Sequence, residues 1–103
     1  MAVAEVTDAT FESDVLRSER PVIVDFWAPW CVPCRRVSPI LEEMSESRED
    51  VAFVKVNVDD NPQAAMNYSI SSIPTIARFE EGQVTQKAIG ALPKNQLSAQ
   101  LGL

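Results

Sequence analysis

The stretch that decides the fold is Val22–Cys34, which reads VIVDFWAPWCVPC. It begins as an almost continuous apolar run, and such a run is typical of a strand buried on both faces of a sheet. Asp25 interrupts the run, and the chain's only two cysteines, Cys31 and Cys34, follow it with two residues between them. We therefore treat the aspartate and the cysteine pair as candidates for one site.

The composition, with 46% hydrophobic and 23% charged residues, indicates one globular domain, residues 1–103. No apolar run reaches the roughly 18 residues that a membrane span needs. The first residues show no signal peptide, which favours a cytoplasmic location, or an organellar stroma or matrix if a transit peptide has been removed. A net charge of −6 without a Lys/Arg cluster argues against nucleic-acid binding.

The hydrophobic pattern predicts strands and helices that alternate along the chain. The expected strands are Val3–Val6, Val22–Trp27, Val51–Val58, Thr75–Phe79 and Val84–Ile89. The expected helices run from a cap at Thr7 or Asp8 to about Arg17, from the cysteine pair through Met44, around Gln63–Tyr68, and over Lys94–Leu101. The fold class is thus α/β, a mixed central sheet of about five strands flanked by about four helices, whose last two strands form a hairpin.

The cysteine pair has three possible roles. A structural zinc site needs four ligands, and this chain has no histidine and no further cysteine, so we expect no metal site and no cofactor. A purely structural disulfide would close so short a loop that it would restrict the unfolded chain only weakly. A redox centre fits best, because the pair follows a buried strand and opens the clearest helix.

The start of a helix suits a reactive thiol. Its unpaired N–H groups and partial positive charge stabilise a thiolate, which lowers a cysteine pKa from about 8.5 into a range of roughly 3.5–7.5. Cys31 stands at the mouth of the helix and Cys34 one turn further in. We therefore expect Cys31 to be the accessible nucleophile and Cys34 to resolve the mixed disulfide.

At this point the chain resembles the thioredoxin family. Phe26–Cys34 is similar to the family's active-site segment, and Ser72–Thr75 is similar to its cis-proline loop. Gly82 and Gly90 match two late glycines of the family. The resemblance extends over essentially the whole chain and implies the thioredoxin fold.

A buried aspartate would be costly without a partner. Lys55 interrupts the next apolar strand, so the two opposite charges are candidates to partner each other. Burial raises a carboxyl pKa and a nearby ammonium opposes the rise, which would leave Asp25 able to exchange a proton near neutral pH. The resemblance implies this role for Asp25, with Lys55 as its neighbour and Cys34 as the thiol it deprotonates.

The resemblance also implies a surface that binds substrate. Trp30 would cover the disulfide, and a cis Ile73–Pro74 bond would bring the Ile73 backbone beside it, whereas Trp27 is expected to be a core aromatic. The apolar docking patch would consist of Val32, Pro33, Ile73, Pro74, Ile89, Gly90 and Ala91. The chain departs from the family pattern at Val32, where glycine is usual, at Arg36, and at Arg78, whose place in a strand the sequence does not explain.

The function implied is that of a general thiol–disulfide oxidoreductase that reduces protein disulfides through Cys31 and Cys34. Its expected partners are disulfide-containing target proteins and a thioredoxin reductase, dependent on NADPH or ferredoxin, in electron transport for cell redox homeostasis. We expect a monomer. Two alternatives remain open, a disulfide oxidase or isomerase on the same fold and a non-catalytic module of a larger assembly.

Overall fold

The structure is a computed structural model that describes residues 3–103. The strands are β1 (Val3–Glu5), β2 (Val22–Trp27), β3 (Ala52–Asn57), β4 (Thr75–Glu80) and β5 (Gln83–Ile89). The helices are the short π-helix η1 (Glu12–Leu16), α1 (Val32–Ser47), α2 (Pro62–Asn67) and α3 (Lys94–Gln100). The expected order of elements is confirmed over the described residues.

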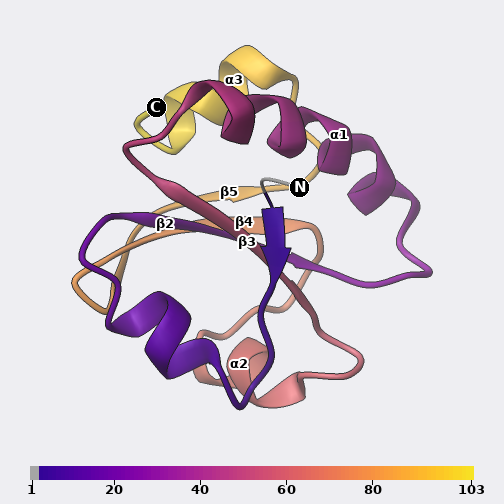
Figure 1. Ribbon diagram of the computed structural model, residues 1–103. Helices are drawn as coiled ribbons and strands as arrows, with labels where there is room; N and C mark the ends of the chain where they lie inside the picture. The colour runs from indigo at the N-terminus through magenta and orange to yellow at the C-terminus, as the bar shows by residue number, and fades with distance from the viewer. Residues whose placement is uncertain (1–2) are drawn as a thin grey trace.

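One mixed sheet forms the centre of the molecule, with the strand order β1-β3-β2-β4-β5. The strands β1, β3 and β2 are parallel, whereas β4 runs antiparallel to β2 and β5 antiparallel to β4. Helices α1 and α3 cover one face of the sheet, and η1 and α2 cover the other (Figure 1). With helices on both sides, the central strands are buried on both faces, as their apolar sequences predict.

Side-chain alternation along β2 assigns each residue to one face of the sheet. Val22, Val24 and Phe26 pack into the core on the α2 side, whereas Ile23 packs into the core on the α1 side. Asp25 has the same parity as Ile23, so its side chain lies on the face covered by α1. This places the aspartate under the helix that begins beside the cysteine pair.

The first helix is shorter than the sequence predicts. It was expected to begin with a cap at Thr7 or Asp8, but η1 begins at Glu12 and has no side-chain cap. The carboxylate of Asp8 instead accepts hydrogen bonds from the backbone N–H groups of Gln63 (3.1 Å) and Ala64 (2.9 Å). Asp8 therefore caps α2, a helix that lies more than fifty residues further along the chain.

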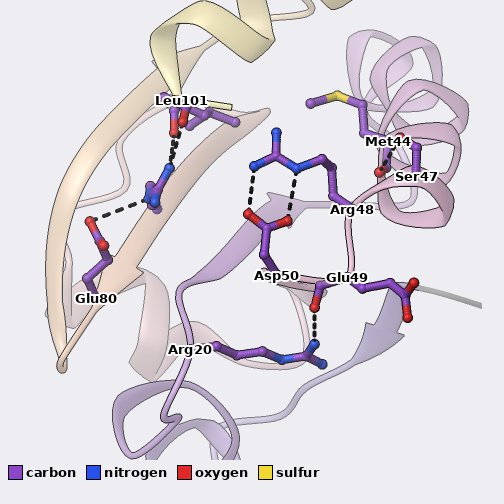
Figure 2. Close-up of polar contacts among 10 residues, drawn as sticks. Arg20, Met44, Ser47, Arg48, Glu49, Asp50, Glu80 and Leu101 are labelled. Atoms are coloured by element: carbon purple, nitrogen blue, oxygen red, sulfur yellow. Dashed lines mark hydrogen bonds and ion pairs between the residues drawn. The ribbon is translucent and has the colours of Figure 1, made fainter.

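The structure explains the arginine within β4. Arg78 Nη1 donates hydrogen bonds to the carbonyl oxygens of Leu101 (2.8 Å) and Gly102 (3.0 Å), just beyond the last turn of α3. Its Nε lies 3.4 Å from a carboxylate oxygen of Glu80. Figure 2 draws the contacts to Leu101 and Glu80 as dashed lines. Arg78 thus satisfies carbonyl groups that a helix end leaves unpaired and fastens α3 to the sheet.

Candidate active site

The cysteine pair lies where β2 leads into α1. Cys31 and Cys34 form a disulfide, with their Cα atoms 5.3 Å apart. Cys31 is the N-cap residue of α1, and its Sγ accepts a hydrogen bond of 3.2 Å from the backbone N–H of Cys34. The expectation that the pair opens this helix is confirmed. A sulfur in this position receives the stabilisation that a helix N-terminus gives to a thiolate.

Exposure does not distinguish the two cysteines in the disulfide form. Cys31 is 4% exposed and Cys34 2% exposed, so the expected contrast between an open and an enclosed thiol is absent in this state. Both cysteines belong to one buried cluster with Ala28, and Trp27, Val58 and Ile73 pack against it. The two residues still differ in position, since Cys31 caps the helix and Cys34 lies within it.

Asp25 lies on the α1 side of β2, beneath the pair, and is 3% exposed. A small cavity of about 80 Å³ is lined by Asp25, Cys34 and Lys55 together with Trp27, Arg35 and Ser38. Burial raises the pKa of the Asp25 carboxyl from 3.8 to about 7, while the charge of Lys55 opposes the rise. Oδ1 of Asp25 has no hydrogen-bond partner within residues 3–103. The carboxyl and the inner cysteine thus border the same cavity.

Lys55 is the residue that pairs with Asp25 in the parallel register of β2 and β3. The structure therefore places it beside the aspartate, as expected. The ion pair that Lys55 makes is nevertheless with Glu5 of β1, at 3.9 Å from Nζ to Oε1. Its ammonium also lies 5.3 Å from the centre of the Trp27 ring, within the range of a cation–π contact. Lys55 therefore interacts with Glu5 and Trp27 as well as lying beside Asp25.

The side chain of Trp30 is held by a hydrogen bond to a residue that follows β3. Its indole Nε1 donates a hydrogen bond of 2.9 Å to Asp59, just beyond β3, and the side chain is 65% exposed. A hollow of about 200 Å³ lies beside it, lined also by Val58 and Ile73 and by residues from α2 and the loop after it. The residue before the first cysteine thus forms one wall of an open, largely apolar hollow.

The cis-proline loop reaches the cysteine pair from the start of β4. The Ile73–Pro74 peptide bond is cis, which confirms the expectation, and Ile73 packs against the cluster that contains both cysteines. The N–H of Gly90 donates to the Pro74 carbonyl at 2.9 Å, and Ile89 pairs with Thr75 across β4 and β5. Gly90 has a φ of 94°, a backbone conformation that favours glycine.

The residues that the sequence predicts for the docking patch lie on three segments of the chain. The first turn of α1 contributes Val32, which is 54% exposed, and the exposed Pro33. The proline loop contributes Ile73 and the buried Pro74, while the end of β5 and the residues after it contribute Ile89, Gly90 and Ala91. Ile89 is 59% exposed, so apolar surface is open to solvent on two of the three segments.

Comparison with known proteins agrees with this geometry. The family model described as thioredoxin matches residues 2–102. The chain is a member of the thioredoxin family. It is 52% identical over 101 residues to "Thioredoxin 1" of Nostoc sp., with 97% of this chain and 94% of that protein covered. It is 49% identical to "Thioredoxin" of Pyropia yezoensis (98% and 95% covered) and 50% identical to "Thioredoxin" of Synechocystis sp. (97% and 94% covered).

Family membership and geometry together settle the class of chemistry. The thioredoxin fold expected from the resemblance is confirmed by the five-stranded mixed sheet and its flanking helices. With its cysteine pair at disulfide distance, the thioredoxin domain is a thiol–disulfide oxidoreductase. Among residues 3–103 there is no group of three or more Cys, Asp or Glu side chains arranged to hold a metal ion. In that same range no helix is long and apolar enough to cross a membrane.

Sequence reasoning missed several residues of the site. Trp27 packs against the buried cluster that contains both cysteines, as expected of a core aromatic, but it also lines the cavity and lies under Lys55, which the sequence does not indicate. Arg35 and Ser38 line the same cavity. Ser38 follows Cys34 by four residues and Arg35 by three, and these helical spacings are the signal that could have indicated Ser38. Asp59 lies just past the carboxyl end of β3, at the edge where β2 also ends.

Proposed function

We propose that this thioredoxin-family chain reduces disulfide bonds in target proteins, with Cys31 as the nucleophile and Cys34 as the resolving thiol. The observation that supports this most strongly is the cavity that Cys34 shares with Asp25, directly beneath the N-terminus of α1. It provides a proton acceptor at the inner thiol, while the helix end favours a thiolate at the outer one.

In the first step, the Cys31 thiolate attacks one sulfur of the target disulfide. A bond forms between Cys31 and that sulfur, the target's own S–S bond breaks, and its second sulfur leaves as a thiolate that takes up a proton from water. The N-terminus of α1 favours a thiolate over a thiol at its cap residue, which keeps a larger fraction of reduced Cys31 in the reactive form. The product is a mixed disulfide between Cys31 and the target.

In the second step, Cys34 releases the target. Asp25 accepts the Cys34 proton, and the resulting thiolate attacks the sulfur of Cys31. The Cys31–Cys34 bond forms, the mixed disulfide breaks, and the target's sulfur leaves as a second thiolate. Two electrons have passed to the target, and the chain is left in the disulfide form that the structure describes. A carboxyl whose pKa is raised by burial to about 7 is suited to exchange this proton at neutral pH.

The docking patch and Trp30 position the target. An extended target segment would pair with the backbone of Ile73 beside the disulfide, as a strand pairs with an exposed sheet edge. Apolar side chains of the target would contact Val32, Pro33 and Ile89, whereas the hollow beside Trp30 would take the residues that follow. Gly90 and Ala91 would form the rest of this docking surface.

The cycle needs a source of electrons and a place to operate. A thioredoxin reductase, dependent on NADPH or ferredoxin, would return the chain to its dithiol form, so that it acts as an electron carrier. We propose that it works as a monomeric single domain over residues 1–103 in the cytoplasm, or in an organellar stroma or matrix. It would need no metal or cofactor of its own and would bind neither nucleic acid nor membranes.

A redox titration against dithiothreitol and glutathione buffers, run beside disulfide reduction in a test protein, examines the proposal. A reduction potential of about −270 mV, which is typical of thioredoxins, supports a reductase. A potential above about −180 mV would support an oxidase or isomerase instead. The double variant Cys31→Ser, Cys34→Ser should lose all reductase activity, and a chain that keeps its biological role without both cysteines would be a non-catalytic module.

A further inference from the structure

Three charged residues form a row across three neighbouring strands. Glu5 of β1 pairs in register with Lys55 of β3, and Lys55 pairs in register with Asp25 of β2. Register partners in parallel strands direct their side chains to the same face, which here is the face under α1. Lys55 therefore stands between two carboxylates.

Exposure falls steadily along this row. The Glu5 side chain is 65% exposed and the Lys55 side chain 26% exposed, while Asp25 is 3% exposed. Lys55 thus lies between a solvated carboxylate on its outer side and a buried one on its inner side, and its ammonium can approach either. In the structure its Nζ lies 3.9 Å from Glu5 and forms its ion pair there, while the Lys55 side chain still lines the cavity that Asp25 borders.

We propose that Glu5 is a positioning residue that draws the Lys55 ammonium away from Asp25 and thereby controls how readily the buried carboxyl exchanges its proton. The effect on catalysis rests on the function proposed above, in which Asp25 accepts the Cys34 proton. The row itself does not depend on that function. Strand β3 lies between the strand of Glu5 and the strand of Asp25, and the ion pair of Glu5 is with Lys55 of β3, so the influence of Glu5 passes through Lys55.

In the described part of the chain, the other elements packed against Asp25 add no second cation that lowers its pKa as Lys55 does. From α1, Arg35 and Cys34 border the cavity, but the Arg35 guanidinium donates to the Pro29 carbonyl at 2.8 Å. From β4, the register partner of Asp25 is the apolar Ile76. Lys55 is accordingly the charge that opposes the raised pKa of Asp25. A shift of Lys55 toward or away from Asp25 changes this opposition directly.

The first test measures the Asp25 pKa by NMR of its side-chain carboxyl in the disulfide form. In Glu5→Gln the freed ammonium should favour the Asp25 carboxylate, and the pKa should fall by about 0.5, the size expected for a partly exposed pair. Glu5→Lys should lower it further, because two ammonium groups then repel each other and Lys55 turns inward. The matched control is Glu12→Gln, which removes an equal charge from η1, where Glu12 pairs with Arg17.

A double-mutant cycle with Lys55→Met separates a relayed effect from a direct one. In the Lys55→Met background, Glu5→Gln should change the Asp25 pKa by less than half as much. An undiminished change there would overturn the proposal, and so would an unchanged pKa in both Glu5 variants, or one that only matches the Glu12 control.

The rate at which a mixed disulfide is resolved, followed against pH, gives an independent readout. The midpoint of the profile should move down with the Asp25 pKa in Glu5→Gln. If the pKa moves and the profile does not, the positioning role of Glu5 is supported and Asp25 is not the proton acceptor for Cys34. The two proposals therefore fail in different measurements.

Discussion

The indole of Trp30 donates a hydrogen bond of 2.9 Å to the carboxylate of Asp59. The bond ties the residue before the first cysteine to the loop after β3. Asp59 is itself fixed, because its backbone N–H donates to the Asn57 side chain at 3.0 Å. A tryptophan that is 65% exposed is thus held in one orientation beside the hollow.

Asp59→Ala should release Trp30 and slow reaction with protein disulfides by about 2- to 10-fold, the range that follows from losing one such hydrogen bond. Reaction with a small disulfide reagent should change much less, because it does not need the wall that Trp30 forms. Steady-state kinetics with both substrates and tryptophan fluorescence anisotropy make the measurement. Asp59→Asn, which keeps an acceptor oxygen, is the matched control, and equal losses with both substrates would contradict a docking role.

Asp25→Ala should make the protein more stable at neutral pH. The folded state holds the Asp25 proton up to about pH 7, whereas the unfolded chain loses it near pH 4. Between these values the folded state binds more protons, so its unfolding free energy falls as the pH rises. The full rise in pKa corresponds to about 4 kcal/mol, present below pH 4 and lost by about pH 7.

Urea unfolding at several pH values tests this expectation. Asp25→Ala should lack the fall between pH 4 and 7 and should be more stable at pH 7 by about 1–3 kcal/mol. Asp25→Asn keeps the volume of the side chain and separates the loss of charge from the loss of packing. Resolution of mixed disulfides should slow by roughly 10-fold or more. A variant that is less stable than the parent by 1 kcal/mol or more at pH 7 would show that Asp25 is structural.

Cys31 should be the thiol that reacts first after reduction. The N-cap position favours its thiolate, so iodoacetamide at mildly acidic pH should label Cys31 about 10-fold faster than Cys34. Mapping the adduct by mass spectrometry identifies the site. Cys31→Ser and Cys34→Ser form the matched pair, and preferential labelling of Cys34 in the parent protein would reverse the assigned roles.

Val32→Gly should affect access more than redox potential. Valine restricts the backbone in both redox forms, so its contribution to the potential largely cancels, and we expect a shift of less than about 30 mV. The exposed side chain borders the approach to Cys31, so removing it should speed reaction with bulky protein disulfides more than with a small reagent. A large shift in potential with an unchanged ratio of the two rates would make Val32 a determinant of potential.

Much of the fold follows from local pattern. Strands β2 and β3 are recognisable as nearly continuous apolar runs, because both of their faces are buried. Helix α1 is recognisable from the i, i+3, i+4, i+7 spacing of Val37, Ile40, Leu41 and Met44, because one of its faces packs on the sheet. The cysteine pair at the start of a helix and the aspartate in a buried strand also stand out in a single sequence. These features sufficed to identify the strands, the long helix and the central residues of the site.

The remaining features depend on contacts between distant segments. Nothing near Arg78 in the sequence indicates that its partners are the carbonyls of Leu101 and Gly102. The relation of Glu5 to Lys55 appears only once the strand order and register are known, because fifty residues separate the two in the chain. Long-range polar partners of this kind leave no periodic trace in the chain.

The cap that Asp8 places on α2 links the beginning of the chain to the hollow beside Trp30. Ala65, in α2, lines the hollow beside Trp30, and the helix has no side-chain cap from its own N-cap residue, Asn61. Local opening of the segment around Asp8 would uncap α2, so amide hydrogen exchange in the two regions should rise and fall together. A target seated in the hollow would accordingly slow exchange near the N-terminus, a segment that it need not touch.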